Sequence, residues 1–337
     1  MNDSPAGTIY WIDHYTIPTN DLDRSEKFHE RVLGAVHVPV PGEQRERGIF
    51  QQLSNYRHGL FVQRVSLPSP EPLGLGLPRI AHFVRTAEID AHRRRLDACG
   101  VEHTDPVRMS AYGEDGTSIC WLDVDGNQFE LWAPDRLPEA ALDDCGPLGI
   151  GRVSHGVYAS RDLARTAAFF ERYCALRPLR SADVPADTLV LPLATAGRLI
   201  FKLVGELGKR TSGRGLYRDL HTALTVREDQ FFPNYERMWR ELPEWDYDQR
   251  RGPFTGDGLV LPARTAQHGG VFGFRFKDTF GRGDDWFDPD TNLFHFLGGA
   301  ARDASMTRYD PHPMEDYMDA YLAAHAPGPR PVALIAG

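Results

Sequence analysis

The feature that most constrains the fold is a repeat that divides the 337-residue chain into two similar halves. His14 and His155 lie 141 residues apart, and the same offset aligns the residues that follow each histidine. The aligned pairs are Asp21/Asp162, Leu22/Leu163, Arg24/Arg165, Phe28/Phe169, Glu30/Glu171 and Arg31/Arg172. Such self-similarity is the mark of duplicated structural units. We therefore expect two related domains, at 1–135 and 150–298, followed by a C-terminal extension at 299–337.

Each half divides again into two smaller units. A second histidine follows the first at a similar distance, at His82 in the first half and at His221 in the second. Each histidine lies in a strand-like run, and in the first half helices are predicted over 21–33 and 87–99, each followed by a glycine and short strands. The pattern of strand, helix and two or three strands is thus written four times. Extra residues of the second half are placed at 227–268 and interpreted as a lid or as an extra helix and loop.

Composition narrows the classes of partner. The formal net charge is −9, which disfavours a nucleic-acid-binding surface and attraction to anionic membranes. No apolar stretch is long enough to span a bilayer, and the first residues lack the pattern of a signal peptide. The sequence therefore predicts a cytoplasmic protein whose partners include neither nucleic acid nor a membrane.

Three residues in strand-like runs carry the strongest chemical signal. His14, His82 and Glu130 each lie among β-branched and aromatic residues. Two imidazoles and one carboxylate can hold a divalent metal on one side and leave its other side open. If these side chains meet in space, the protein is a metalloenzyme.

At this point the sequence resembles a known superfamily. The matching features are the opening His14 with the segment 19–28, the second histidine at the start of the next module, and Asp-x-Asp-Gly-Asn-x-x-Glu at 123–130. Together they resemble the vicinal oxygen chelate superfamily, which includes glyoxalase I, bleomycin-resistance proteins and type I extradiol dioxygenases. The resemblance covers about 8–135 and 150–298. It implies an α+β fold in which four βαβββ modules pair into two half-barrel, cup-shaped domains.

The resemblance also implies two sets of metal ligands. They are His14, His82 and Glu130 in the first domain, and His155, His221 and His295 in the second. The final histidine of the second set departs from the usual carboxylate. Two-domain extradiol dioxygenases usually keep their metal in the C-terminal cup, but we place the main site in the first half because only that half keeps the carboxylate.

The expected reaction is extradiol ring cleavage. The resemblance suggests an Fe(II) dioxygenase in which a catechol-like aromatic substrate and O₂ bind the metal together, with Mn, Zn, Ni or Co as alternative metals. This reaction requires an acid–base group near the metal. Tyr112 is the candidate in the first half and His268 in the second, with His58 and His103 as alternatives.

Two other functions fit the same residues. A glyoxalase-type isomerase or lyase would use the metal to stabilise an enediolate while a carboxylate moves a proton. A non-catalytic protein would hold an aromatic ligand in the cup without a metal. The superfamily often dimerises, so a homo-oligomer is also expected.

Overall fold

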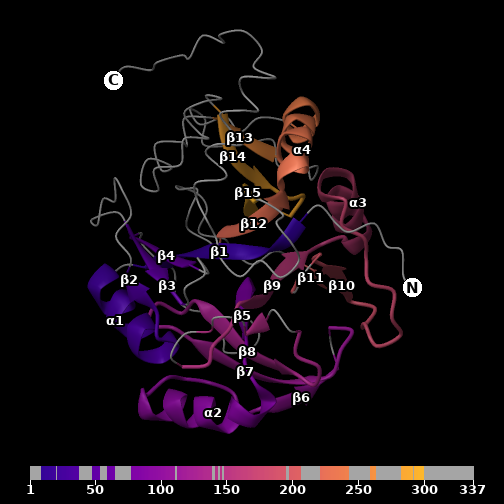
Figure 1. Ribbon diagram of the computed structural model, residues 1–337. Coiled ribbons are helices and arrows are strands. Elements are labelled where there is room, and N and C mark those ends of the chain that lie inside the picture. The colour runs from indigo at the N-terminus through magenta and orange to yellow at the C-terminus, as the bar shows by residue number, and fades with distance from the viewer. Residues whose placement is uncertain are drawn as a thin grey trace, which may run out of the picture.

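The computed structural model of the chain (Figure 1) describes residues 9–19, 21–37, 48–53, 59–64, 77–110, 112–138, 141–142, 145, 148–194, 197–205, 221–242, 259–262, 282–290 and 292–299. His58 and His268 lie outside these residues. So do the C-terminal extension from 300 onward and residues 243–258 and 263–268 of the predicted insertion.

The described elements follow the predicted order, module by module. Module 1 contains β1 (Ile9–Thr19), α1 (Leu22–Leu33), β2 (Val36–His37), β3 (Gly48–Gln52) and β4 (Gly59–Arg64). Module 2 contains β5 (Arg79–Phe83), a 3₁₀ turn (Thr86–Glu88), α2 (Ile89–Ala98), β6 (Val107–Met109), β7 (Gly116–Leu122) and β8 (Gln128–Pro134). Module 3 contains β9 (Val153–Ser160), α3 (Leu163–Cys174), β10 (Thr188–Pro192) and β11 (Arg198–Leu203). Module 4 contains β12 (His221–Arg227), α4 (Glu228–Glu241), β13 (Leu259–Pro262), β14 (Arg282–Phe287) and β15 (Leu293–Gly299).

The modules do not pair in the order of the sequence. Sheet A has the strand order β13-β14-β15-β12-β1-β4-β3-β2 and joins module 4 to module 1. Sheet B has the order β10-β11-β9-β5-β8-β7-β6 and joins module 3 to module 2. Each sheet thus takes strands from both halves of the chain, through the antiparallel pairs β1–β12 and β5–β9 (Figure 1). The repeat reveals the modules but not the pairing, because the first strand of any module can pair with that of any other.

The α+β fold class is confirmed, with curled sheets and helices on their outer sides (Figure 1). We call the face of sheet A opposite the Tyr15 side chain cup A. We call the face of sheet B that carries Glu130 and His155 cup B. Cup A therefore belongs to modules 1 and 4, and cup B belongs to modules 2 and 3.

Local signals set the helix ends. The Asp21 side chain accepts a hydrogen bond from the backbone of Arg24 and caps α1, which buries Leu22, Phe28, Val32 and Leu33 on one side. Gly34 ends the helix in the left-handed region, at φ 70°. Asp162 caps α3 in the same way.

Part of the predicted lid is an ordinary element of the fold. Residues 228–241 form α4, which follows β12 directly and contacts β12, β15 and α3. Glu241 of α4 accepts a hydrogen bond from Arg172 of α3 at 2.7 Å. This segment is therefore the helix of module 4, which agrees with the expectation of a helix within 227–268 and not with that of a lid.

Aromatic side chains fill the core behind the sheets. Trp121 stacks on Phe129 at 4.4 Å between ring centroids, and Trp286 stacks on Phe294 at 4.8 Å in the second half. Tyr15 meets Phe129 edge-on at 5.9 Å, which brings the back of sheet A against the back of sheet B. The repeat thus extends from sequence to packing.

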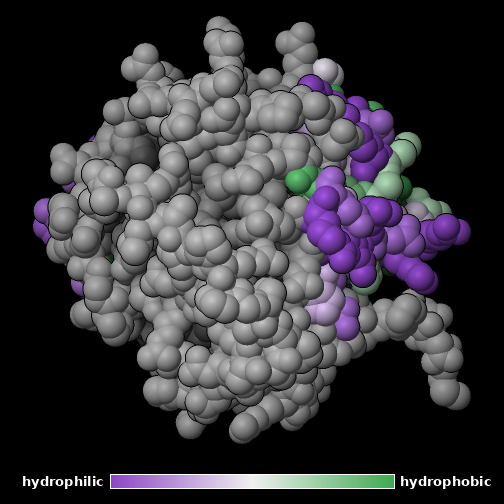
Figure 2. Space-filling model, turned by 90° about the horizontal axis from the view of Figure 1, so that it is seen from above, coloured by the Kyte–Doolittle hydropathy of each residue, from purple (hydrophilic) through white to green (hydrophobic). Residues whose placement is uncertain are grey.

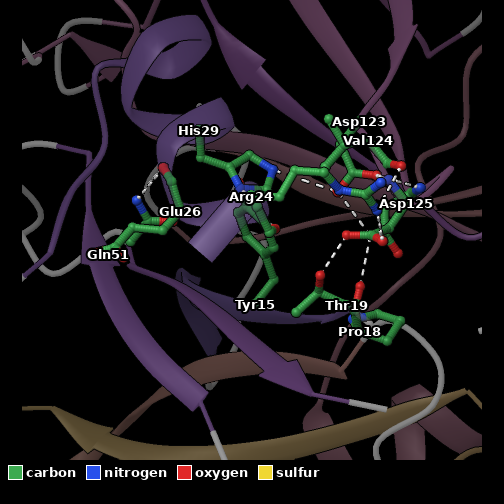
Figure 3. A network of polar contacts seen from close by, with 12 residues as sticks. Tyr15, Pro18, Thr19, Arg24, Glu26, His29, Gln51, Asp123, Val124 and Asp125 are labelled. Carbon is green, nitrogen blue, oxygen red and sulfur yellow. Dashed lines mark hydrogen bonds and ion pairs between the residues drawn. The ribbon is translucent and has the colours of Figure 1, made fainter. Parts of the chain in front are cut away.

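The Asp-x-Asp-Gly-Asn motif joins module 2 to module 1 (Figure 3). Asp125 accepts hydrogen bonds from the Thr19 hydroxyl at 2.5 Å and from Arg24 at 2.7 Å. Asn127 donates to the Pro18 carbonyl at 2.9 Å, and Asp123 lies 3.5 Å from the His29 ring. The motif therefore ties the loop before β8 to the end of β1 and the start of α1.

The second half repeats this junction. Asp290 accepts a hydrogen bond from Arg161 at 2.9 Å, and Asn292 donates to the Ala159 carbonyl at 3.1 Å. These contacts tie module 4 to module 3. Each half is thus held together by its motif, whereas each sheet crosses between the halves.

The described surface seen from above is mainly hydrophilic, with small hydrophobic areas among the polar residues (Figure 2). Among the described residues, no helix has the length and apolar character needed to cross a membrane.

Candidate functional site

Strand β1 is irregular at the position of His14. Ile12 lies opposite Leu224 of β12, and Tyr15 lies opposite Thr222, so three steps along β1 match two along β12. The extra residue is a bulge, a feature that re-aims side chains and is common beside active sites. Both Ile12 and Tyr15 belong to the core behind the sheet, so the two residues between them form the bulge.

The bulge holds His14 through its neighbour. Nδ1 of His14 lies 2.8 Å from Oδ1 of Asp13, and only 3% of His14 and 4% of Asp13 are exposed. Because a carboxylate can only accept, we assign the proton to Nδ1 and the lone pair to Nε2. A histidine whose Nδ1–H is held by a carboxylate has the arrangement that orients metal-binding imidazoles.

Strand β9 repeats the bulge around His155. Ala81 lies opposite His155 and His82 lies opposite Val153, so one residue of β9 is extra. The Ser154 hydroxyl lies 2.9 Å from Nδ1 of His155, in the place of the Asp13 carboxylate. Both cups therefore carry a histidine that is held at Nδ1 by the residue before it.

In cup B the histidine meets a buried ionic network around Glu130. Oε2 of Glu130 lies 2.8 Å from Nε of Arg79 and 3.3 Å from Nε2 of His155, and Oε1 accepts from the Ser118 hydroxyl at 2.8 Å. Arg79 also donates to the Tyr112 hydroxyl at 2.9 Å. Since Nε2 of His155 faces a carboxylate, we assign its proton to Nε2, and Ser154 donates to Nδ1.

The charges of this network are fixed by burial and by Arg79. Burial alone would raise the pKa of the Glu130 carboxyl, but the Arg79 charge and the hydrogen bonds from His155 and Ser118 hold it at about 2. Burial lowers the pKa of His155, so its imidazole is neutral. The pKa of Arg79 is raised by Glu130 against the opposing effect of burial. The network around Glu130 thus joins one carboxylate to one guanidinium, and a second ion pair, Arg198 with Glu114 at 2.7 Å, lies beside Tyr112.

Tyr112, the predicted acid–base residue, lies in this network. Its ring packs on His155 at 4.6 Å between centroids, and its hydroxyl lies 3.5 Å from Oε2 of Glu130. Burial, followed by the Glu130 charge, raises its pKa well above the usual range, so the phenol keeps its proton. The alternative His103 binds Asp97 of α2 at 3.0 Å and lies outside the network.

His82 points to the other side of sheet B. Ala81 lies opposite Glu130 and His82 lies opposite Leu131, so His82 and Glu130 face opposite sides. Nε2 of His82 accepts from the Tyr15 hydroxyl at 2.9 Å, and Nδ1 donates to the Gly151 carbonyl at 3.2 Å. Burial lowers the pKa of His82 to about 4.

The structure therefore does not bring His14, His82 and Glu130 together. His14 belongs to sheet A, whereas Glu130 faces cup B and His82 faces the core between the sheets. Nor do the members of the second predicted set share a sheet, because His155 lies on β9 of sheet B while His221 and His295 lie on β12 and β15 of sheet A.

The backbone register regroups these residues by cup. In sheet B, Ala81 lies between His155 on β9 and Glu130 on β8. In sheet A, Ala223 occupies the matching place, opposite His295 on β15 and beside the β1 bulge. His295 is thus the counterpart of Glu130, and His14 is the counterpart of His155.

The third position of each cup follows from the same register. Arg79 lies opposite Val157, two residues after His155. His221 lies opposite Thr16, two residues after His14. Arg79 and His221 are therefore counterparts, and the backbone brings His14, His221 and His295 to three adjacent strands of sheet A. The side chains of His221 and His295 are not described.

Among the described side chains, no group of three or more histidine, cysteine, aspartate or glutamate residues could hold a metal ion. In cup B the described partners of Glu130 include only one such residue, His155. Arg79, which cannot bind a cation, occupies the position that matches His221 in cup A, so the residues of cup B do not fit a metal.

Sequence reasoning missed Arg79, Asp13 and Ser154. Arg79 shares its face of β5 with Ala81, and its alternation with His82 is visible in the sequence. Only the register with β8, however, shows which face carries Glu130. Asp13 and Ser154 matter because of bulges, which the spacing of apolar residues did not reveal.

Comparisons with known proteins agree with this architecture. Residues 11–131 match the sequence profile of the Glyoxalase/Bleomycin resistance protein/Dioxygenase superfamily. A crystal structure of a candidate dioxygenase from Bacillus subtilis is similar, with a TM-score of 0.58 and 14% identity over 96% of this chain and 98% of that one. A crystal structure of a glyoxalase I mutant from Zea mays gives a TM-score of 0.52 and 16% identity over 86% and 93%. A comparison with curated protein sequences gives no match.

The two structural similarities, at such low identity, concern the fold alone. The profile match covers the three features named in the first half, which are His14 with the segment 19–28, His82, and the motif that ends at Glu130. These findings agree with the resemblance drawn from the sequence: residues 11–131 match the glyoxalase/bleomycin resistance protein/dioxygenase superfamily, and the fold of the chain is similar to those of the two solved structures.

Proposed function

We propose that the protein is a metal-dependent dioxygenase whose metal is held in cup A by His14, His221 and His295. The observation that carries this proposal is the Asp13–His14 hydrogen bond at the β1 bulge. It puts the lone pair of His14 on Nε2, and the register brings the other two histidines to the neighbouring strands. The superfamily includes dioxygenases and glyoxalase I, which supports an enzyme that acts on a small molecule.

The donor set fits a first-row divalent metal. Imidazole nitrogen suits Fe, Zn, Ni and Cu, and three protein ligands leave positions for other molecules. Asp13 strengthens His14 as a ligand because its carboxylate accepts the Nδ1 proton. We propose Fe(II), with Mn, Zn, Ni and Co as the alternatives to be tested.

The proposed substrate is a catechol-like aromatic molecule. Three neutral imidazoles cancel none of the charge of a divalent cation, so the cup favours an anionic ligand with two adjacent oxygen atoms. When bound, Fe(II) supplies the point at which such a substrate and O₂ meet. The part of the protein is to hold the three histidines in place and to supply a group that takes the phenolic proton.

Asp285 is our candidate for that group. It lies opposite His295 in the β14–β15 pair, so its backbone position is next to a proposed ligand. Tyr112, which we expected to fill this role, lies in the other cup and keeps its proton. A carboxylate beside the metal also suits a glyoxalase-type isomerase, which moves a proton between carbon atoms. The position of Asp285 opposite His295 is therefore the observation that favours an isomerase as the second candidate function.

Oxygen consumption separates the two candidates. The chain is purified without oxygen, loaded separately with Fe(II), Mn, Zn, Ni or Co, and mixed with catechol, with alkyl-substituted catechols or, in separate samples, with a hemithioacetal. Uptake of one O₂ per substrate with Fe(II), with a ring-opened product, supports the dioxygenase. Turnover of a hemithioacetal with Zn, Ni or Co and no uptake of O₂ would contradict it and support the isomerase.

A further inference from the structure

The two cups differ at three matched positions. Cup B has Arg79 where cup A has His221, Glu130 where cup A has His295, and Ser154 where cup A has Asp13, while both keep the histidine at the bulge. We propose that the guanidinium of Arg79 takes the place of the metal in cup B, and that this cup is a metal-free ionic core. The inference stands on described side chains and does not depend on the metal proposed for cup A.

Both carboxylate oxygens of Glu130 already accept hydrogen bonds, so neither is readily available to a metal. Oε2 meets Arg79 at 2.8 Å and His155 at 3.3 Å, and Oε1 accepts from Ser118 at 2.8 Å. Arg79 balances the single negative charge of the carboxylate. A divalent cation added here would meet one carboxylate and one adjacent guanidinium, and would be repelled by the latter.

The tautomer of His155 agrees with this assignment. Its Nε2, which faces the centre of the cup, carries the proton that goes to Glu130, and Ser154 donates to Nδ1. In cup A the Asp13 carboxylate takes the Nδ1 proton instead, so Nε2 of His14 carries the lone pair. The serine and the aspartate thus suit a structural and a ligating histidine respectively.

Apolar side chains close the space around the network. Ala81, Phe83, Trp132, Val157 and Ile200 are buried on the cup B face. Residues of the linker between the halves pack over them, namely Leu137, Ala141 and Leu142. With 10% of its side chain exposed, Arg79 is nearly sealed from solvent. The linker therefore completes a core rather than the wall of a ligand site.

If Arg79 alone keeps the metal out, one substitution should create a site. Arg79→His would leave an imidazole beside His155 and Glu130, which is a set of two histidines and one carboxylate. Glu130 would then lose the cation that now binds it and would need another. Arg79→Lys is the matched control, because it keeps a positive charge near Glu130 and supplies no imidazole.

The test measures bound metal rather than activity, after dialysis against Co(II) and buffer. As a single substitution, His155→Ala should leave the cobalt content at the level of the wild type. We expect His14→Ala with Arg79→His to bind about one Co(II) per chain with visible cobalt absorption, and to lose it when Glu130→Gln is added. His14→Ala alone, or with Arg79→Lys, should bind less than about a tenth as much.

Two results would overturn the inference. One is cobalt in the His14→Ala protein that disappears with His155→Ala, because cup B would then hold a metal despite Arg79. The other is a folded protein with His14→Ala and Arg79→His that binds no more cobalt than His14→Ala alone. A wild-type chain that binds no metal would instead contradict the proposal for cup A. Both results named above could still be measured in that case, because neither requires a metal in cup A.

Discussion

Nε of Arg79 lies 2.8 Å from Oε2 of Glu130, and both side chains are buried inside cup B. In our proposal this ion pair takes the place of the metal that the sequence suggested around Glu130. Cup A would then be the site of the chemistry, and cup B would be part of the core.

The pair should be costly to break from one side. Glu130→Gln leaves the Arg79 guanidinium buried without its counter-charge, so we expect a loss of about 3–5 kcal/mol in the free energy of unfolding. Arg79→Met together with Glu130→Gln removes both charges and should recover most of this loss. Urea denaturation of the three proteins at pH 7 checks the prediction, and a double variant as unstable as Glu130→Gln would contradict it.

His82 should make stability depend on pH below neutrality. Burial holds its pKa at about 4 in the folded chain, against 6.5 for an ordinary histidine. Between these values the unfolded chain binds the additional proton, so stability falls as the pH drops from 6.5 to 4, by at most about 3 kcal/mol from this residue.

His82→Gln is the variant that isolates this effect. Its amide can accept from Tyr15 and donate to Gly151, but it does not titrate. Denaturation at pH 7, 5.5 and 4.5 should give a smaller decrease for the variant than for the wild type. Equal decreases would show that His82 does not titrate as described.

The repeat also predicts a stabilising substitution. Ala175 ends α3 at φ 52°, in the left-handed region that Gly34 occupies at the end of α1, 141 residues earlier. Because a Cβ is unfavourable in this region, Ala175→Gly should stabilise the chain by about 1 kcal/mol, and Gly34→Ala should destabilise it by a similar amount. Thermal unfolding of both variants provides the check; a lower melting temperature for Ala175→Gly would refute the prediction.

Much of the fold followed from local signals. The repeat indicated four modules, and the glycine after the helix predicted over 21–33 indicated the end of α1, because both signals depend on residues close in sequence. The pairing of modules 1 with 4 and 2 with 3 did not follow, because it depends on contacts between β1 and β12 and between β5 and β9, far apart in the chain.

The candidate site shows the same limit. The histidines and Glu130 were recognised as residues suited to metal binding, but their grouping assumed that each half closes its own cup. His82 and Glu130 lie on opposite faces of sheet B, a difference of one residue in register. Arg79 carried no motif, so only its contact with Glu130 revealed its role.

The metal content of four single variants tests the central claim most directly. The chain is loaded with Fe(II) without oxygen, dialysed, and analysed for iron as wild type and as His14→Ala, His221→Ala, His295→Ala and His155→Ala, with circular dichroism to verify folding. We predict about one iron per chain for the wild type and for His155→Ala, and at least a tenfold loss for each of the other three. Iron that is lost with His155→Ala and kept with His14→Ala and His221→Ala would place the metal in cup B and contradict the account.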